Sequence, residues 1–339
     1  MKLFASHLGQ SIPSSRHRIL QYIPYLDRQG ISVLLSKGLL DAYPPSSKLL
    51  QPVWGGAKLL EGLANIPLSY TCDVSFVQRH FISKFSTVEP WFKKPMILDV
   101  DDAIWLNGEA SVQKNAALAS TVICGNSFLA EYFSKINPRI EILPTAIDMD
   151  FYQANSVEPP TGKSDKFVVG WSGSSGGFKY LYEIEGALKK LLEHDRRIHF
   201  HVMSDKAPEF KSLNSDRVVF QKWSPAGEAA FIQGFSVGIM PLIDGLWERG
   251  KCSYKMLSYM ASRLPVVVSP VGMNAEVLSL AECGFSAANE DEWVSTLIAL
   301  FDDASLGSKL GQNGYQLISE RFSLEVLSQK MAKILRSVL

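Results

Sequence analysis

Three cationic side chains, Arg249, Lys251 and Lys255, lie close together in the sequence and could bind an anion. The pattern around them predicts a helix over residues 251–262, whose first turns would hold the cluster. A helix N-terminus already carries partial positive charge, so cations there are disfavoured unless an anion offsets them. Only Glu248 offers a nearby negative charge. The cluster indicates an anion site; the alternative is a solvated basic helix start that binds nothing.

A second candidate anion site follows about 20 residues later, at Pro270-Val271-Gly272. Glycine lets the backbone approach a ligand closely before the next helix begins near Asn274. A third is the run Ser172–Gly177, SGSSGG, where Gly173 and Ser174 could present backbone N–H groups to a phosphate. A bare flexible turn is the alternative there. Anion sites at the ends of neighbouring strands favour a diphosphate ligand.

The elements that would position these residues alternate between strand and helix. This alternation is typical of parallel, doubly wound sheets. Helices are expected at residues 16–28, 128–135, 180–193 and 251–262. Strands are expected at residues 2–6, 31–35, 73–78, 95–100, 121–124, 139–143, 167–171, 198–203, 218–220, 237–242 and 265–269.

The run Trp247–Ala261, WERGKCSYKMLSYMA, resembles the donor-binding half of glycosyltransferase family 4. Those proteins are retaining transferases of the GT-B fold, and the likeness is to bacterial members with a W-x-R-G-K-C-x-x-K-x-L-x-Y-M-A block. Gly125–Ser127 and Pro144–Asp148 are similar to the same subgroup. The resemblance implies an α/β protein with two doubly wound Rossmann-like domains facing across a cleft. The family's Glu-x7-Glu pair would fall on Gly250 and Ser258, so both glutamates are absent.

The resemblance places nucleotide-sugar donor binding in the second half of the chain. Fixed cations would stabilise charge on the leaving diphosphate, and those catalytic residues would be Arg249, Lys251 and Lys255. Glu248 would restrain this cluster or contact the transferred sugar. Asn274 and Glu276 would also contact that sugar. Trp223 would meet the nucleotide base, or simply pack. The full set of expected donor-binding residues is Gly173, Ser174, Lys179, Trp223, Glu248, Gly272, Asn274 and Glu276.

The acceptor is expected on the first half, at Arg16, Arg79, Asp101 and Asp102, which follow predicted strands. Polar groups at strand ends are the usual site position in open α/β sheets. The aspartates could instead cap the next helix. Asp99 and Asp101 also form a D-x-D run, which could hold a divalent metal. His80 is more often a structural residue in such a position.

Length and composition set the domain plan. With 339 residues the chain suits two domains of about 160 residues each. The polar linker 155–166 predicts domains at 1–155 and 156–322. The tail 323–339 is an amphipathic helix that either packs back on the first domain or lies on a membrane surface. A formal charge of zero argues against nucleic acid as a partner.

Four separated cysteines indicate a reducing compartment and no structural zinc. The N-terminal apolar run is short for a signal peptide, so a cytoplasmic protein is expected, either free or peripheral at the inner face of the membrane.

The predicted reaction is transfer of a hexosyl group from a nucleotide-diphosphate sugar to a saccharide or glycolipid acceptor. The resemblance implies retention, and the cation cluster makes a metal or other cofactor unnecessary. Two alternatives are a non-catalytic sugar-nucleotide-binding subunit and a metal-dependent transferase that uses Asp99 and Asp101. An oxidoreductase is disfavoured because the loop after the first strand lacks G-x-G-x-x-G.

Overall fold

The computed structural model describes residues 1–339 except 10–11, 39, 41–43, 83–84 and 155–165. It contains two compact units. The first comprises Met1–Ala146, Arg249–Cys252 and Leu324–Leu339, and the second comprises Ile147–Glu248 and Ser253–Ser323. The units therefore divide at Ala146, before the domain boundary expected at residue 155. Residues 155–165 of the expected linker lie outside the described residues.

The first unit is built on a six-stranded parallel sheet of order β2-β1-β3-β4-β5-β6. The central strands are buried along their whole length, as strands covered on both faces must be. Their positions agree with the sequence to within about a residue. The strands are β1 (Lys2–Ser6), β2 (Ser32–Leu35), β3 (Val74–Gln78), β4 (Met96–Val100), β5 (Thr121–Cys124) and β6 (Ile140–Ile142).

The helix expected over residues 16–28 is wrong as a single element. It is divided into α1 (Pro13–Arg18), η1 (Leu20–Tyr22) and α2 (Ile23–Arg28). Ile19 leaves the helical region with φ of −139°, and Pro24 lies at the start of α2. Proline has no N–H to donate, so it suits a helix start rather than a helix interior. The other helices here are α3 (Gln51–Ser69), η2 (Glu89–Trp91), η3 (Ile104–Asn107), α4 (Glu109–Leu118) and α5 (Ser127–Ser134).

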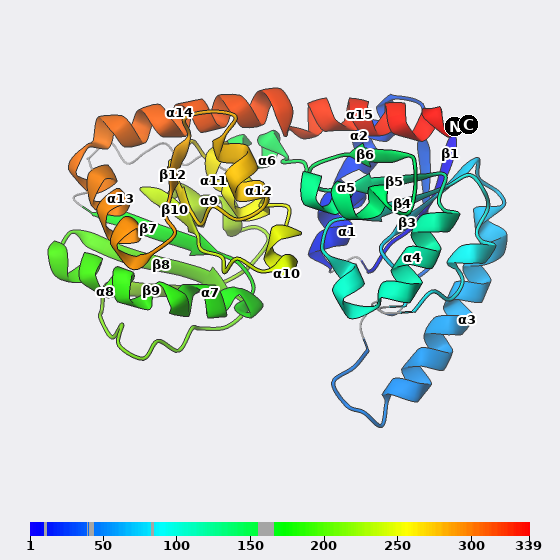
Figure 1. The fold of residues 1–339 in the computed structure, drawn as a ribbon, viewed down its shortest axis with the longest axis horizontal. Helices are drawn as coiled ribbons and strands as arrows, with labels where there is room; N and C mark the ends of the chain where they lie inside the picture. The colour runs from blue at the N-terminus through cyan, green and yellow to red at the C-terminus, as the bar shows by residue number, and fades with distance from the viewer. Residues whose placement is uncertain (10–11, 39, 41–43, 83–84, 155–165) are drawn as a thin grey trace. The chain divides into compact units, whose positions relative to one another are not determined.

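The C-terminal helix α15 (Leu324–Ser337) belongs to the first unit and runs beside α2 (Figure 1). Its apolar stripe, with Leu324, Leu327 and Met331, joins the core that also holds Leu3 and Ile19. The stripe is therefore buried against protein and is not left for a membrane surface. None of the described helices is long and apolar enough to cross a membrane.

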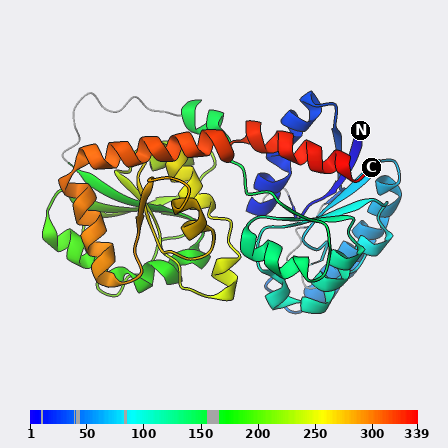
Figure 2. The ribbon, with the colours of Figure 1, turned by 45° about the horizontal axis from the view of Figure 1, so that its top comes forward.

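The second unit repeats the plan with a parallel sheet of order β12-β11-β10-β7-β8-β9, flanked by helices (Figure 2). Its strands are β7 (Phe167–Ser172), β8 (Ile198–Ser204), β9 (Val218–Lys222), β10 (Val237–Met240), β11 (Val266–Val268) and β12 (Gly284–Ser286). Its helices are α6 (Met149–Ala154), η4 (Ser175–Gly177), α7 (Phe178–Glu183), α8 (Glu185–His194), α9 (Glu228–Gln233), α10 (Leu246–Arg249), α11 (Tyr254–Ala261), α12 (Met273–Leu278), α13 (Glu290–Asp302) and α14 (Ala304–Arg321).

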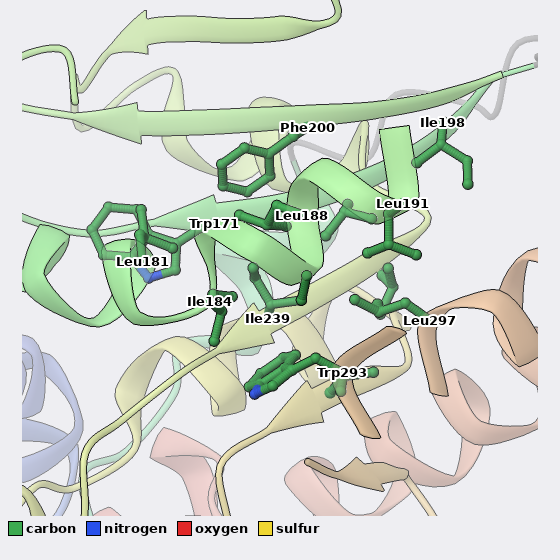
Figure 3. Packing of buried hydrophobic residues seen from close by; sticks show 14 of the residues in the cluster. Trp171, Leu181, Ile184, Leu188, Leu191, Ile198, Phe200, Ile239, Trp293 and Leu297 are labelled. Carbon is green, nitrogen blue, oxygen red and sulfur yellow. The ribbon is translucent and has the colours of Figure 1, made fainter. Parts of the chain in front are cut away.

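One core of this unit packs α7, α8 and α13 against the sheet (Figure 3). Trp171 and Phe200 project from the strands toward Leu188 of α8, and Trp293 of α13 lies on the same side. Trp171 is 1% exposed. This packing fixes the carboxyl end of β7, from which the next loop starts.

Candidate active site

The order of the second sheet locates its ligand crevice. From β7 the chain adds β8 and β9 on one side, and then β10 pairs with β7 on the other. In open α/β sheets, ligands bind at the carboxyl ends of the strands where the winding direction reverses. Here that point lies at the ends of β7 and β10. The loop after β7 begins with Gly173 and Ser174, two of the expected donor residues.

The expected helix start at residue 251 is wrong. A short helix, α10, ends at Arg249, and α11 begins only at Tyr254. Ser253 between them adopts a left-handed conformation with φ of 50°, which interrupts the helix. Arg249 and Lys251 are therefore outside the first turn of α11 and belong to the first unit. Of the three predicted catalytic cations, Lys255 alone lies in that turn.

Lys255 extends along Trp171 at the end of β7. Its Nζ lies 5.6 Å from the ring centroid of Trp171. A side chain at residue 173 would block this path, because a Cβ on Gly173 would lie 2.3 Å from the Lys255 Cε. The aromatic face favours a cation above it. Gly173 thus makes room for the Lys255 side chain at the strand end where a ligand is expected.

The small-residue loop has fewer backbone donors to offer than its sequence suggests. The N–H of Gly173 donates to Met203 O at 3.0 Å, and that of Gly177 donates to Ser174 O at 2.9 Å. The N–H of Ser175 donates to the Asp205 carboxylate at 2.6 Å. These three donors are satisfied within the protein. Support for a phosphate from this loop would have to come from its remaining groups and from Lys255.

Glu248 holds Lys179, another residue of the expected donor site. Its Oε1 accepts hydrogen bonds from Lys179 Nζ at 3.0 Å and from the Tyr180 hydroxyl at 2.5 Å. Burial raises the pKa of Glu248, but these two hydrogen bonds outweigh it and hold the pKa below its ordinary value. Glu248 is thus a restrained carboxylate. Tyr180 was not expected from the sequence, because a tyrosine inside an amphipathic helix gives no sign of its partner.

Gly272 and Asn274 have structural roles after β11. Gly272 has φ of 53° and ψ of −131°, a conformation that side chains rarely tolerate. Asn274 is completely buried, with its Nδ2 donating to Ser269 O and its Oδ1 accepting from Ser253 Oγ at 2.7 Å. The expected contact between Asn274 and a sugar is therefore not supported. Glu276 lies in the first turn of α12, partly exposed.

Trp223 follows β9 at the edge of the sheet and is half-buried. Its Nε1 donates to Glu228 Oε2 at 3.1 Å, and the other oxygen of Glu228 accepts from Ser172 Oγ at 3.4 Å. A chain of polar contacts therefore connects Trp223 to the end of β7. The indole is oriented by Glu228, which is compatible with either packing or a base contact.

In the first unit the winding reverses between β1 and β3, and the expected acceptor residues gather beyond those strands. Arg79 directly follows β3 and adopts a left-handed conformation with φ of 54°. Its guanidinium contacts Asp101 Oδ1 at 2.5 Å, also pairs with Asp102, and donates to Ser14 Oγ at 2.9 Å. Three of the four expected acceptor residues are thus joined by one arginine.

The two aspartates differ in protonation behaviour. Burial raises the pKa of Asp101, but Arg79 outweighs it and lowers the pKa below its usual value. For Asp102, burial and the neighbouring Asp101 charge raise the pKa, with Arg79 and Lys251 opposing. Lys251 therefore lies within electrostatic reach of Asp102. Arg16, in α1, is partly exposed and helps burial to lower the pKa of the adjacent His17 to about 3.

Asp99 is not available as a metal ligand. It is completely buried, and its carboxylate is held by Arg18 through Nε at 3.1 Å and Nη2 at 2.5 Å. Although burial opposes a charged group, the Asp99 carboxylate raises the pKa of Arg18 above its ordinary value. The D-x-D run is thus divided between two ion pairs. Within the described residues, no group of acidic, histidine and cysteine side chains forms a metal cluster.

The segment Arg249–Cys252 is locked into the first unit by residues of the G-N-S run. Asn126 caps α5 by accepting from Leu129 N, and its Nδ2 donates to the carbonyls of Arg249 at 3.2 Å and Lys251 at 3.0 Å. A Cβ on Gly125 would lie 2.1 Å from the Cys252 Sγ. These contacts fix the backbone that carries Arg249 and Lys251.

All four cysteines are free and buried.

His80, next to Arg79 in the first unit, is a buried titratable side chain. Its ring hydrogen-bonds Ser111 Oγ at 3.2 Å, and burial, followed by the Arg79 charge, lowers its pKa to about 4. The unfolded chain binds a proton at this residue below about pH 6.5, whereas the folded chain binds it only below about pH 4. We expect this residue to contribute a loss of about 2 kcal/mol in the free energy of unfolding between pH 7 and pH 5. Urea unfolding at both pH values should show a smaller loss for His80→Asn; an equal loss would contradict the prediction.

Comparison with known proteins agrees with this architecture. Residues 168–303 match the family model described as Glycosyl transferases group 1. No match is found among curated proteins. The fold is GT-B: the chain consists of two Rossmann-like units with parallel six-stranded sheets, and the second carries the matched group 1 domain.

Three solved structures illustrate the likeness. HepE from Anabaena, in complex with UDP and glucose, has a TM-score of 0.68 at 15% identity and covers 99% of both chains. A glycosyltransferase from Rickettsia africae has a TM-score of 0.73 at 13% identity, covering 99% of this chain and 98% of its own. A trehalose-6-phosphate protein from E. coli, bound with UDP-2-fluoro glucose, has a TM-score of 0.71 at 13% identity over 100% of both chains. At these identities the likeness concerns the fold.

Proposed function

We propose that this protein is a retaining glycosyltransferase that moves a hexosyl group from a nucleotide-diphosphate sugar to a saccharide or glycolipid acceptor. The observation that carries the proposal is the position of Lys255, held along Trp171 at the point where the second sheet reverses its winding. The matched group 1 domain contains this point. The similar solved structures include one with UDP-glucose, which supports a sugar nucleotide as the donor.

In this proposal, the donor diphosphate lies beside Lys255, and the charge that develops as the sugar leaves is stabilised by that ammonium. Arg249 and Lys251, which belong to the first unit, stay predicted catalytic residues. The remaining parts of the donor would be contacted by Lys179, Trp223 and Glu276. Of these, Lys179 is held in place by Glu248. No nucleophilic carboxylate is assigned, and a metal is not required for the step. A cytoplasmic location stays a prediction.

Arg79, Asp101 and Asp102 would bind the acceptor. Asp102 is the more exposed of the two aspartates, with a side chain 20% exposed against 10% for Asp101. Its raised pKa suits a carboxyl that shares a hydrogen bond with a sugar hydroxyl. Arg79 would hold both carboxylates in place, and Arg16 would lie at the same end of the sheet.

The test begins with a thermal-shift panel of uridine, guanosine and adenosine diphosphate sugars. We expect one of them to raise the melting temperature, because a ligand that binds the folded state stabilises it. Release of the nucleoside diphosphate, with and without a chelator, then measures turnover, and the anomeric configuration of the product reports retention. Binding without release in the presence of any acceptor would favour a non-catalytic subunit. Loss of release with chelator would favour a metal-dependent enzyme.

A further inference from the structure

Helix α3 in the first unit exposes apolar side chains and buries polar ones, the reverse of an ordinary surface helix. Every exposed position between residues 49 and 70 is uncharged, and most are apolar. Leu49, Leu50, Val53, Leu59, Leu60 and Leu63 are exposed, with Val53 at 72% and Leu60 at 69%. The helical ones recur at spacings of three, four and seven residues and so share one side of α3. We call these six residues the apolar face of α3.

The opposite side of α3 is polar and points into the protein. Lys58 is 1% exposed, and its Nζ donates to Glu61 Oε1 at 2.5 Å and to Leu40 O at 2.7 Å. Asn65 is fully buried, accepting from Lys37 N at 2.8 Å and donating to Lys37 O at 2.9 Å. Turning the leucines inward would break these bonds and leave buried polar groups without partners. The hydrogen bonds of Lys58 and Asn65 therefore fix the rotation of α3 that leaves its apolar face exposed.

The ends of the helix carry interfacial side chains. Lys48 is exposed just before α3. At the other end Tyr70 is 60% exposed, and Lys93 Nζ lies 6.0 Å from its ring centroid. Trp91, in the adjacent η2, is 55% exposed. Tyrosine, tryptophan and lysine are enriched where a protein meets the lipid headgroups.

Among the described residues in and beside α3, the acids are withdrawn from the surface. Glu61 pairs with Lys58, and Glu89 is fully buried, accepting from the backbone N–H groups of Phe81 and Thr87. Lys48 and Lys93 remain at the two ends. If the α3 helices of two copies paired symmetrically, each lysine would lie near a lysine of the other copy, and this repulsion is unfavourable. An anionic surface complements them.

We propose that the apolar face of α3 inserts into the headgroup region of an anionic lipid bilayer, with the helix lying in the plane of the surface. The N-terminal half of α3 extends beyond the neighbouring elements of its unit, so the face can be reached (Figure 1). The membrane contact that was the alternative for the C-terminal helix is thus proposed for a different element. Binding here requires neither the donor site nor a glycolipid acceptor.

Co-sedimentation tests the proposal, using the full chain and vesicles of phosphatidylcholine with phosphatidylglycerol. We expect the wild-type protein to sediment with these vesicles and less with pure phosphatidylcholine. Leu63→Glu should weaken binding at least about tenfold, because it replaces buried apolar area with a charge. Leu280→Glu is the matched control, since Leu280 in the second unit is 44% exposed against 43% for Leu63. Lys48→Glu should weaken binding about fivefold at low salt.

Each other outcome overturns the proposal. Wild-type protein that stays in the supernatant, or a Leu63→Glu variant that binds as well as Leu280→Glu does, would contradict it. A dimer in analytical ultracentrifugation that Leu63→Glu dissociates, without vesicle binding, would assign the face to a second copy. Circular dichroism checks that the variants fold. Donor release measured in solution should be the same in all of them, so failure here is distinguishable from failure of the proposed function.

Discussion

Lys255→Ala should lower the turnover number for nucleoside diphosphate release by about 10²–10³-fold. The ammonium of Lys255 is held beside the end of β7 by the Trp171 ring and the space left at Gly173. Its charge is most useful when the diphosphate gains negative charge, which happens in the transition state. The turnover number should therefore fall much more than KM rises. A residue that only bound the donor would give the reverse.

Two further variants sharpen this experiment. Lys189→Ala is the control. It removes a half-exposed lysine of α8 that has no assigned role in the site, and it should leave turnover unchanged. Gly173→Ala keeps the ammonium but places a Cβ 2.3 Å from the present Lys255 Cε, so the side chain must move. We expect that variant to lose activity while it still binds the sugar nucleotide in the thermal-shift panel. Normal turnover in Lys255→Ala would remove this residue from the mechanism.

Hydrophobic pattern predicted most of the fold because strand burial is a local property of the sequence. Runs such as Val266–Val268 are apolar along their length, which is typical of strands covered on both faces. Boundaries that depend on distant partners were predicted less well. The helix begins at Tyr254, after Ser253 in its left-handed conformation. The segment just before it is held by Asn126, which lies far away in the sequence and donates to the carbonyls of Arg249 and Lys251. A spacing rule within one segment does not detect such a partner.

The same limit explains the site residues. Lys255 and Gly173 were expected to belong to one donor site although they lie far apart in the sequence, and the structure brings them together. Asn274 was expected to face a sugar because it follows a glycine turn, yet its amide is used to join Ser253 to Ser269. Asp99 is the second-last residue of an otherwise apolar strand, and a buried carboxylate needs a cation. The sequence could therefore have predicted a cationic partner for Asp99, but it does not identify that partner as Arg18.

Asp99→Ala should lower the free energy of unfolding by about 3–5 kcal/mol, because it leaves the Arg18 guanidinium charged and buried without its partner. Arg18 is 1% exposed, and its only other described hydrogen bonds are to Leu143 O at 2.7 Å and Thr145 Oγ1 at 3.5 Å. Urea unfolding followed by circular dichroism measures the loss. Asp195→Ala, which breaks the exposed pair with Arg197, is the control and should leave the unfolding midpoint almost unchanged.

The double variant Arg18→Met/Asp99→Leu separates an ion pair from a metal ligand. If Asp99 only neutralises Arg18, replacing both by apolar residues of similar volume should restore most of the lost stability, since no buried charge remains. Donor release should then recover, because neither side chain reaches the surface. If Asp99 instead bound a catalytic metal, the single variant would fold normally and lose its metal-dependent activity, and the double variant would stay inactive. The completely buried bidentate contact between Asp99 and Arg18 favours the first result.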